Sequence, residues 1–218
     1  SYRIDILHEV DVIEDVAIAY GYDKLEPEIP KVATIGEESE ESKFKSKLAE
    51  LLIGLGLTEI STYHLIKEEE EDAVEVENSR TEYKRLRQNL IIPALRILSE
   101  NKHNEYPQNI FEIGTTFVKH EQEIIEKEKL TVVLCHGNAN FTEIKQILNV
   151  IFENFNINYD INEASNKYFI EGRCGKIIVN DKTIAYLGEI HPKLITRFGL
   201  EVPIASLEID IDELSQVV

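Results

Sequence analysis

The sequence predicts an α+β fold with a mainly antiparallel sheet flanked by helices. Strand-like segments with alternating apolar residues and a few long helical patterns both occur, but they do not alternate strictly along the 218 residues. Parallel α/β folds require that alternation, so its absence favours antiparallel strands. A short polar turn at 180–182, between two strand-like segments, also indicates a hairpin.

A helix and a strand, separated by a polar break, form the expected centre of the core between residues 86 and 118. Pro93 suits the first turn of a helix, where its missing N–H is not needed. Ala94 and Leu98 then continue an apolar face at helical spacing. Residues 109–118 alternate as a strand with one buried face does.

The remaining elements follow from the same periodicities. The clearest helical pattern begins at Phe141, after a capping-box-like pair formed by Asn140 and Glu143. Further helices are expected at 11–20, 38–55, 141–155 and 191–198. Further strands are expected at 58–66, 73–76, 130–136, 158–161, 174–179, 183–190 and 205–211. Residues 120–129 are expected to be a polar hairpin connection.

The charge balance argues against binding of free nucleic acid by this chain. Lys and Arg number 23 and Asp and Glu number 41, which gives a formal net charge of −18. Phosphate binding needs clustered cations, and the tightest cluster is Lys84, Arg85 and Arg87. That cluster could meet a phosphate or an acidic interface, and a solvated turn is an equally good interpretation.

The sequence indicates a cytoplasmic protein without a membrane segment. No apolar run is long enough to cross a bilayer, and nothing near the start resembles a signal peptide. Cys135 and Cys174 lie in apolar segments far apart in sequence, which favours two buried, reduced thiols, with a disulfide as the alternative.

Four acidic residues gather near the N-terminal helix. Asp11, Glu14 and Asp15 can converge on one side of the helix, and Asp5 lies just upstream. Acid-rich first turns are common, so the spacing alone favours ordinary solvated carboxylates. The alternative is an oxygen-only site for a hard cation such as Mg²⁺.

No residue stands out as catalytic. Motifs of the types GxSxG, GxxxxGKS/T, GxGxxG, CxxC and HxxxH are missing from the sequence. His191 precedes Pro192, and a role in fixing the strand-to-helix turn is favoured over a role as a catalytic base. The acidic run at 67–72 is expected to be a solvated loop, with a docking site for a basic partner as the alternative.

Three stretches have sequences whose significance their residue types alone would not reveal. Residues 86–114 read LRQNLIIPALRILSENKHNEYPQNIFEIG, residues 172–200 read GRCGKIIVNDKTIAYLGEIHPKLITRFGL, and residues 3–22 combine Arg3, the acidic positions and YGY. Together they resemble the beta-subunit family of phenylalanyl-tRNA synthetase, of the archaeal or eukaryotic type.

This resemblance implies a class II aminoacyl-tRNA synthetase-like core at 31–218. Residues 1–30 would then be the end of the small module that precedes the core, together with a linker. In this family acidic residues at four such positions are associated with Mg²⁺ near the alpha subunit. The resemblance therefore implies a metal site formed by Asp5, Asp11, Glu14 and Asp15.

The resemblance also implies a non-catalytic partner of the alpha subunit, in an α₂β₂ ligase that uses ATP and Mg²⁺ to join phenylalanine to its tRNA. An adenylating core needs cations for ATP. Arg87 has no supporting context here, and Arg197 lies too far along the C-terminal element. The chain alone is therefore expected to be inactive and to bind tRNA weakly. The alternatives are a free-standing regulatory or scaffold paralogue and, less favoured, an independent enzyme.

Overall fold

The computed structural model describes residues 3–32, 36–120 and 123–217. The chain divides into two compact units, residues 1–38 and residues 39–218. Each unit is described by itself below.

The first unit contains the helix α1 (Glu9–Tyr20) and a single 3-10 turn, η1 (Tyr22–Lys24). His8 caps the helix, and the Asp11 carboxylate accepts the His8 backbone N–H, which completes a capping box. Gly21 ends the helix with a positive φ of 102°. The predicted helix is confirmed. Its apolar side is exposed, because α1 has no buried residue.

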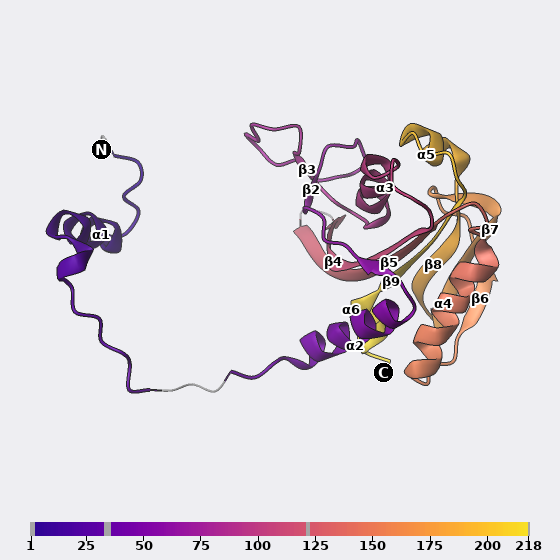
Figure 1. Ribbon diagram of the computed structural model, residues 1–218, viewed down its shortest axis with the longest axis horizontal. Helices are drawn as coiled ribbons and strands as arrows, with labels where there is room; N and C mark the ends of the chain where they lie inside the picture. Colours follow the sequence, from indigo (N-terminus) through magenta and orange to yellow (C-terminus); the bar gives the residue numbers. More distant parts are fainter. Residues whose placement is uncertain (1–2, 33–35, 121–122, 218) are drawn as a thin grey trace. The chain divides into compact units, whose positions relative to one another are not determined.

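The second unit is built on a seven-stranded sheet of order β1-β4-β5-β9-β8-β7-β6, counted among the described residues (Figure 1). Only the β1–β4 pairing is parallel, and the other pairings are antiparallel. The strands are β1 (Thr58–Glu59), β4 (Gln108–His120), β5 (Glu123–Cys135), β6 (Asp160–Glu163), β7 (Phe169–Val179), β8 (Lys182–Ile190) and β9 (Ile204–Asp210).

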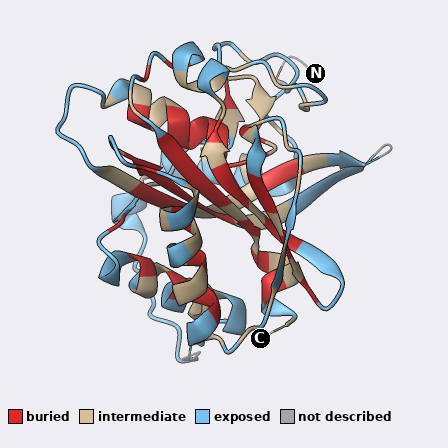
Figure 2. Ribbon diagram, turned by 90° about the vertical axis from the view of Figure 1, so that its right-hand side faces the viewer, coloured by how far each residue is buried: buried red, intermediate tan, exposed pale blue. Residues whose placement is uncertain are grey.

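Helices cover both faces of this sheet, and a small sheet of β2 (Leu65–Ile66) and β3 (Arg85–Leu86) lies apart from it. Three helices pack on one face: α2 (Glu40–Gly54), α4 (Phe141–Asn154) and α6 (Ile211–Ser215). The other face carries α3 (Ile91–Glu100) and the region of α5 (Pro192–Arg197). Figure 2 shows the buried residues concentrated in the sheet and on the helix sides that face it.

Alternation along the strands sorts the core into two apolar clusters. On β5, Leu130, Val132 and Leu134 contribute to the cluster under α2, α4 and α6. Val133 and Cys135 contribute to the cluster under α3. Both faces of the central strands are therefore buried, as a two-sided helical cover requires. The predicted α+β fold with a mainly antiparallel sheet is confirmed.

The expected connection at 120–129 is wrong. Residues 123–129 belong to β5, which pairs with β4 from Glu123 opposite His120 to Cys135 opposite Gln108. The two strands form one long hairpin, and residues 121–122 lie outside the described residues. A polar composition is typical of a connection. Here it belongs to a strand, because this part of the hairpin is partly exposed and can carry charged side chains.

The single strand expected at 58–66 is also wrong, because it is divided into β1 and β2. Between them the Ile60 N–H still bonds to the Phe111 carbonyl, but the Thr62 N–H bonds to the Glu112 carboxylate. That side-chain bond replaces a ladder bond, so the strand is interrupted. The segment 73–76 contributes only an isolated bridge, between Glu75 and Arg85. No helix in the described part of the chain is long and apolar enough to cross a membrane.

Candidate functional site

A set of polar side chains lies on the α3 face of the sheet. Thr131 pairs directly with Glu112 on β4 and with Glu208 on β9, so the three side chains share one side of the sheet. Val133, two residues further on, belongs to the apolar cluster under α3. We call this set the polar face. Its members are Glu112, Thr116, Lys127, Lys129, Thr131, Ser206, Glu208 and Asp210.

Arg87 and Glu112 form a buried ion pair at one side of the polar face. Arg87 Nη1 lies 2.7 Å from Glu112 Oε1, and each residue is 2% exposed. Arg87 also donates from Nε to the Thr115 carbonyl at 2.8 Å and from Nη1 to the Thr62 hydroxyl at 2.7 Å. A Cβ at Gly114 would lie 2.5 Å from Arg87 Nη2, so only glycine leaves room for the guanidinium. Arg87 Nε and Nη1 are thus both engaged inside the chain.

A second carboxylate occupies the start of α3. Glu208 Oε1 accepts the Leu90 N–H at 2.8 Å, while Glu208 Oε2 lies 2.9 Å from Lys129 Nζ. Asn89 Oδ1 accepts the Ile92 N–H at 2.9 Å. Backbone N–H groups at a helix start attract anions. Here a side chain of the same chain supplies the anion.

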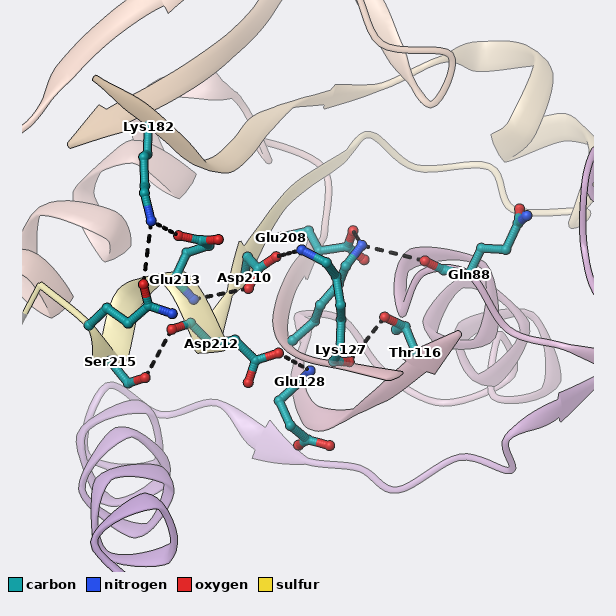
Figure 3. Close-up of polar contacts among 12 residues, drawn as sticks. Gln88, Thr116, Lys127, Glu128, Lys182, Glu208, Asp210, Asp212, Glu213 and Ser215 are labelled. Atoms are coloured by element: carbon teal, nitrogen blue, oxygen red, sulfur yellow. Dashed lines mark hydrogen bonds and ion pairs between the residues drawn. The ribbon is translucent and has the colours of Figure 1, made fainter. Parts of the chain in front are cut away.

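The other cation of the polar face, Lys127, also pairs with a carboxylate of the same chain. Lys127 Nζ lies 2.8 Å from Asp210 Oδ2 (Figure 3). The hydrogen bond to Asp210 raises the pKa of Lys127, although burial opposes the charged form. Next to it, the Glu128 N–H donates to Asp212 Oδ2 at 3.0 Å, which ties β5 to the start of α6.

Glu128 itself points to the opposite face and joins β5 to α2. Lys45 Nζ lies 2.8 Å from Glu128 Oε2, and the Thr115 hydroxyl donates to Glu128 Oε1. Burial disfavours the ionised carboxylate, but the bonds from Lys45 and Thr115 outweigh it, so the pKa of Glu128 is lowered.

The acidic run at 67–72 is not simply solvated, so that expectation is wrong for two of its residues. Glu68 is paired with Arg96 of α3. Glu70 accepts the Tyr168 hydroxyl at 2.8 Å and is nearly buried. Burial, with the nearby Glu70 charge, raises the pKa of Tyr168 well above its usual value. The alternating side chains of the run therefore fasten it to the core.

The basic cluster predicted at 84–87 is neutralised by acids of this chain. Lys84 Nζ lies 2.9 Å from Glu75 Oε1, and Arg85 Nη2 lies 3.8 Å from carboxylate oxygens of Glu69 and of Glu75. Arg87 belongs to the buried pair described above. The cluster does not present three unpaired cations to a phosphate.

Three other residues considered for chemistry have structural roles. His191 is the N-cap of α5, and its Nδ1 accepts the Lys193 N–H at 3.1 Å with Pro192 at the first helical position. This confirms its role in the strand-to-helix turn. Cys135 and Cys174 are free, buried thiols, and burial raises the pKa of each to about 11. Such thiols are poor nucleophiles at neutral pH.

The four predicted metal ligands are only partly brought together. Arg3 donates from Nη1 to Asp15 Oδ2 at 2.5 Å and from Nη2 to Asp5 Oδ2 at 2.6 Å. Asp11 Oδ2 accepts two backbone N–H groups at the helix start. Within the described residues, no three or more His, Cys, Asp or Glu side chains form a group that could hold a metal ion. The all-carboxylate donor set suits a hard cation by its chemistry, and the metal site stays a prediction.

The sequence did not single out four residues that organise the polar face. Lys127 and Lys129 precede a buried strand, and Glu208 and Asp210 lie at the end of another. Each pair has a spacing of two, which places both members on one side of a strand. That spacing was a usable signal, but it could not reveal that the two pairs lie on neighbouring strands.

Two family models match different parts of the chain. The family described as "Phenylalanyl tRNA synthetase beta chain CLM domain" matches residues 25–211, and the family described as "tRNA synthetase B5 domain" matches residues 1–22. The phenylalanine–tRNA ligase beta subunit of Thermococcus sibiricus is 39% identical over 222 residues, covering 96% of this chain and 40% of the relative. That of Pyrococcus abyssi is 38% identical over 229 residues, covering 99% and 41%.

Solved structures show the same fold at low sequence identity. A pyrrolysyl-tRNA synthetase of Desulfitobacterium hafniense aligns with a TM-score of 0.69 and 18% identity, covering 95% of this chain and 78% of that chain. This likeness supports a class II synthetase fold and carries no statement about substrate. The chain spans about 40% of the length of the curated relatives it matches.

Proposed function

Because this chain belongs to the family of phenylalanyl-tRNA synthetase beta chains, we propose that it is a non-catalytic core that assembles with the catalytic alpha subunit. The complete ligase would join phenylalanine to its tRNA with ATP, as a cytoplasmic α₂β₂ assembly. This chain covers less than half of its relatives, so the activity of the whole protein is part of the proposal.

The observation that carries the proposal is the pairing of the cations on and beside the polar face. Arg87, Lys127 and Lys129 each contact a carboxylate of the same chain, at 2.7, 2.8 and 2.9 Å. Adenylation requires cations that are free to hold ATP phosphates and to stabilise the charge that develops on them. Cations that already neutralise internal carboxylates cannot hold ATP phosphates without breaking those ion pairs. This pairing favours a structural role for the chain over a catalytic one.

Residues 1–30 would form the end of a small module, and residues 31–218 would form the core. Within the small module, Asp5, Asp11, Glu14 and Asp15 would hold Mg²⁺ in the assembled ligase, shared with the alpha subunit. The bound ion would supply positive charge that offsets the mutual repulsion of these acids. Their carboxylate oxygens are the ligand type that Mg²⁺ prefers.

Two measurements test the proposal. ATP–pyrophosphate exchange with phenylalanine should be undetectable for the chain alone, and light scattering after size exclusion should show a complex when the alpha subunit is added. Robust exchange without alpha would instead indicate an independent enzyme. Absence of both exchange and complex would favour the free-standing scaffold paralogue.

A further inference from the structure

We propose that the outer edge of β5 pairs with the same edge of a second copy of this chain, in an antiparallel, two-fold arrangement. The surface consists of residues 123–127, which belong to the far end of the long hairpin of β4 and β5. An unpaired strand edge, exposed isoleucines and a self-complementary pattern of charge together point to this partner. Nothing in this pairing depends on the function proposed above.

One edge of β5 is open over residues 123–127. The pairing of β5 with β9 begins only at Lys129, opposite Asp210. Between these parts the Glu128 N–H leaves the strand sideways and donates to Asp212 Oδ2 at 3.0 Å. Asp212 therefore closes the edge at Glu128, and no strand among the described residues pairs with the part beyond it.

The backbone groups of Ile124 and Glu126 face this open edge. In an antiparallel strand, the N–H and C=O groups of every second residue point to the same side, so these two residues share the direction of Glu128. The side chains of Ile124 and Ile125 are also 50% and 40% exposed. A strand edge with unpaired ladder groups and exposed apolar side chains is a template for another strand.

A two-fold pairing centred on Ile125 matches every side chain of the edge with a suitable partner. Ile125 then lies opposite Ile125 of the second copy, and Glu123 of each copy lies opposite Lys127 of the other. Apolar and opposite-charge pairs of this kind stabilise a sheet. Ile124 of one copy faces Glu126 of the other, and their outward N–H and C=O groups exchange backbone hydrogen bonds.

Lys127 can take part without losing its present contact. Its Nζ lies 2.8 Å from Asp210 Oδ2, and its side chain is 36% exposed. An ammonium group carries three N–H donors, so a carboxylate of Glu123 from the second copy can bind beside Asp210.

The neighbouring register is less favourable. A pairing centred on Glu126 would place two glutamates directly opposite each other, and like charges in that position are destabilising. It would also set Ile124 opposite Glu128, whose N–H already donates to Asp212. The charges of the edge therefore select the register centred on Ile125.

The association should be weak. The open edge is short, and small interfaces give transient complexes. Two chains that each carry a formal net charge of −18 also repel one another. We therefore expect association at protein concentrations of about 0.1–1 mM and at physiological salt, where screening limits that repulsion.

Sedimentation velocity of the whole chain, from about 10 μM to about 1 mM, tests the pairing. The average sedimentation coefficient of the parent chain should rise with concentration. Glu123→Lys should weaken association about tenfold or more, because both Glu–Lys pairs become like-charge pairs. The matched control is Glu105→Lys, which makes the same charge change at an exposed glutamate outside the edge and should associate as the parent does.

A charge swap tests the register. Lys127→Glu alone should also associate weakly, whereas a mixture of Glu123→Lys and Lys127→Glu should form a heterodimer, because opposite charges then face each other again. Lys127→Glu also loses its bond to Asp210, so circular dichroism is used to check that it is folded. Ile124→Pro removes an outward N–H without breaking a bond to β4, and it should abolish association whatever the result of the swap.

Hydrogen exchange locates the contact. The amides of Ile124 and Glu126 should become protected as the concentration of the parent chain rises. A parent chain that stays monomeric would overturn the inference, and protection of these amides only on addition of the alpha subunit would assign the edge to that partner instead. Association that survives both Glu123→Lys and Ile124→Pro would overturn it as well. A folded pair of swap variants that fails to associate on mixing would overturn the register.

Discussion

At the scale of single residues, Arg87 and Glu112 show how a charge can be buried without a ligand. The guanidinium reaches the carboxylate, a hydroxyl and a backbone carbonyl, so its Nε and Nη1 donate inside the chain. Breaking such a pair by removing one partner leaves an uncompensated charge in a medium of low dielectric constant. Removing one of the two residues should therefore destabilise the fold, because the other charge stays buried without a counter-ion.

The variant Glu112→Gln should lower the free energy of unfolding by about 3 kcal/mol, because the buried Arg87 charge loses its counter-ion. Urea denaturation monitored by circular dichroism measures this change. The matched control is Glu40→Gln, since Glu40 pairs with Lys43 on the surface of α2 and is 90% exposed. The control should cost less than about 1 kcal/mol. Similar costs for both variants would contradict the burial argument.

The sequence could not predict this pair. The sequence presents Arg87 as part of a basic cluster and as a cation considered for ATP, and Glu112 only as an acid in a strand. They lie 25 positions apart, and their contact depends on the segment before α3 crossing β4. Gly114 carried a hint, because a glycine within a strand often marks the close approach of another group.

At the scale of secondary-structure elements, Glu128 connects three segments. It joins β5 to α2 through Lys45 and to β4 through Thr115. The pKa of this carboxyl is lowered from an ordinary value of 4.5, so folding favours its ionised form. A group with a depressed pKa stabilises the fold above its unfolded pKa, and that contribution is lost as pH falls through the folded pKa.

The pH dependence of stability should therefore reveal Glu128. Below about pH 5 the free energy of unfolding of the parent chain should fall more steeply than that of Glu128→Gln, which has no carboxyl to protonate. Urea denaturation at a series of pH values from neutral to acid gives both curves. Parallel curves over that range would show that the ties to Lys45 and Thr115 do not hold the ionised form.

Elements with a strong period were predictable, and those held by tertiary contacts were not. The helix expected at 141–155 is α4, because one apolar stripe and the Asn140 cap define it locally. The hairpin of β4 and β5 is longer than the sequence predicts, because the polarity of residues 120–129 is typical of a connection. Its strands are stabilised by pairing with each other, which a local pattern does not encode.

At the scale of the whole molecule, the excess of acids dominates the long-range field. The net charge is −18, and Lys84 and Arg85 of the predicted basic cluster lie beside Glu75. Phosphate contacts need cations that are free to replace condensed counter-ions. Lys84 and Arg85 are therefore not free to make phosphate contacts with a nucleic acid.

The chain alone should bind tRNA weakly at physiological salt, and lowering the salt should not produce tight binding, because repulsion grows as screening falls. Fluorescence anisotropy of labelled tRNA across a salt series measures this. Lys84→Gln should change the weak affinity little, since Lys84 already contacts Glu75. Tight, salt-sensitive binding would contradict the prediction.

The fold class was accessible from the sequence because helices and strands without strict alternation leave few architectures. The position of the polar face on the sheet could not be predicted from the sequence. It depends on strand order, and β9 lies between β5 and β8 although it is the last strand. That order brings Asp210 beside Lys127 and Glu208 beside Lys129, which no local pattern indicates.

The mutual neutralisation of the polar face also bears on how such a chain can change over generations. Any single substitution that frees Arg87 for an external phosphate first leaves a buried charge without a partner and makes the chain less stable. Proteins have only a few kcal/mol of stability to lose. A lineage carrying the Arg87–Glu112 pair therefore meets a stability barrier on a one-step path that turns Arg87 toward an external phosphate, and selection for folding alone is enough to keep the barrier in place.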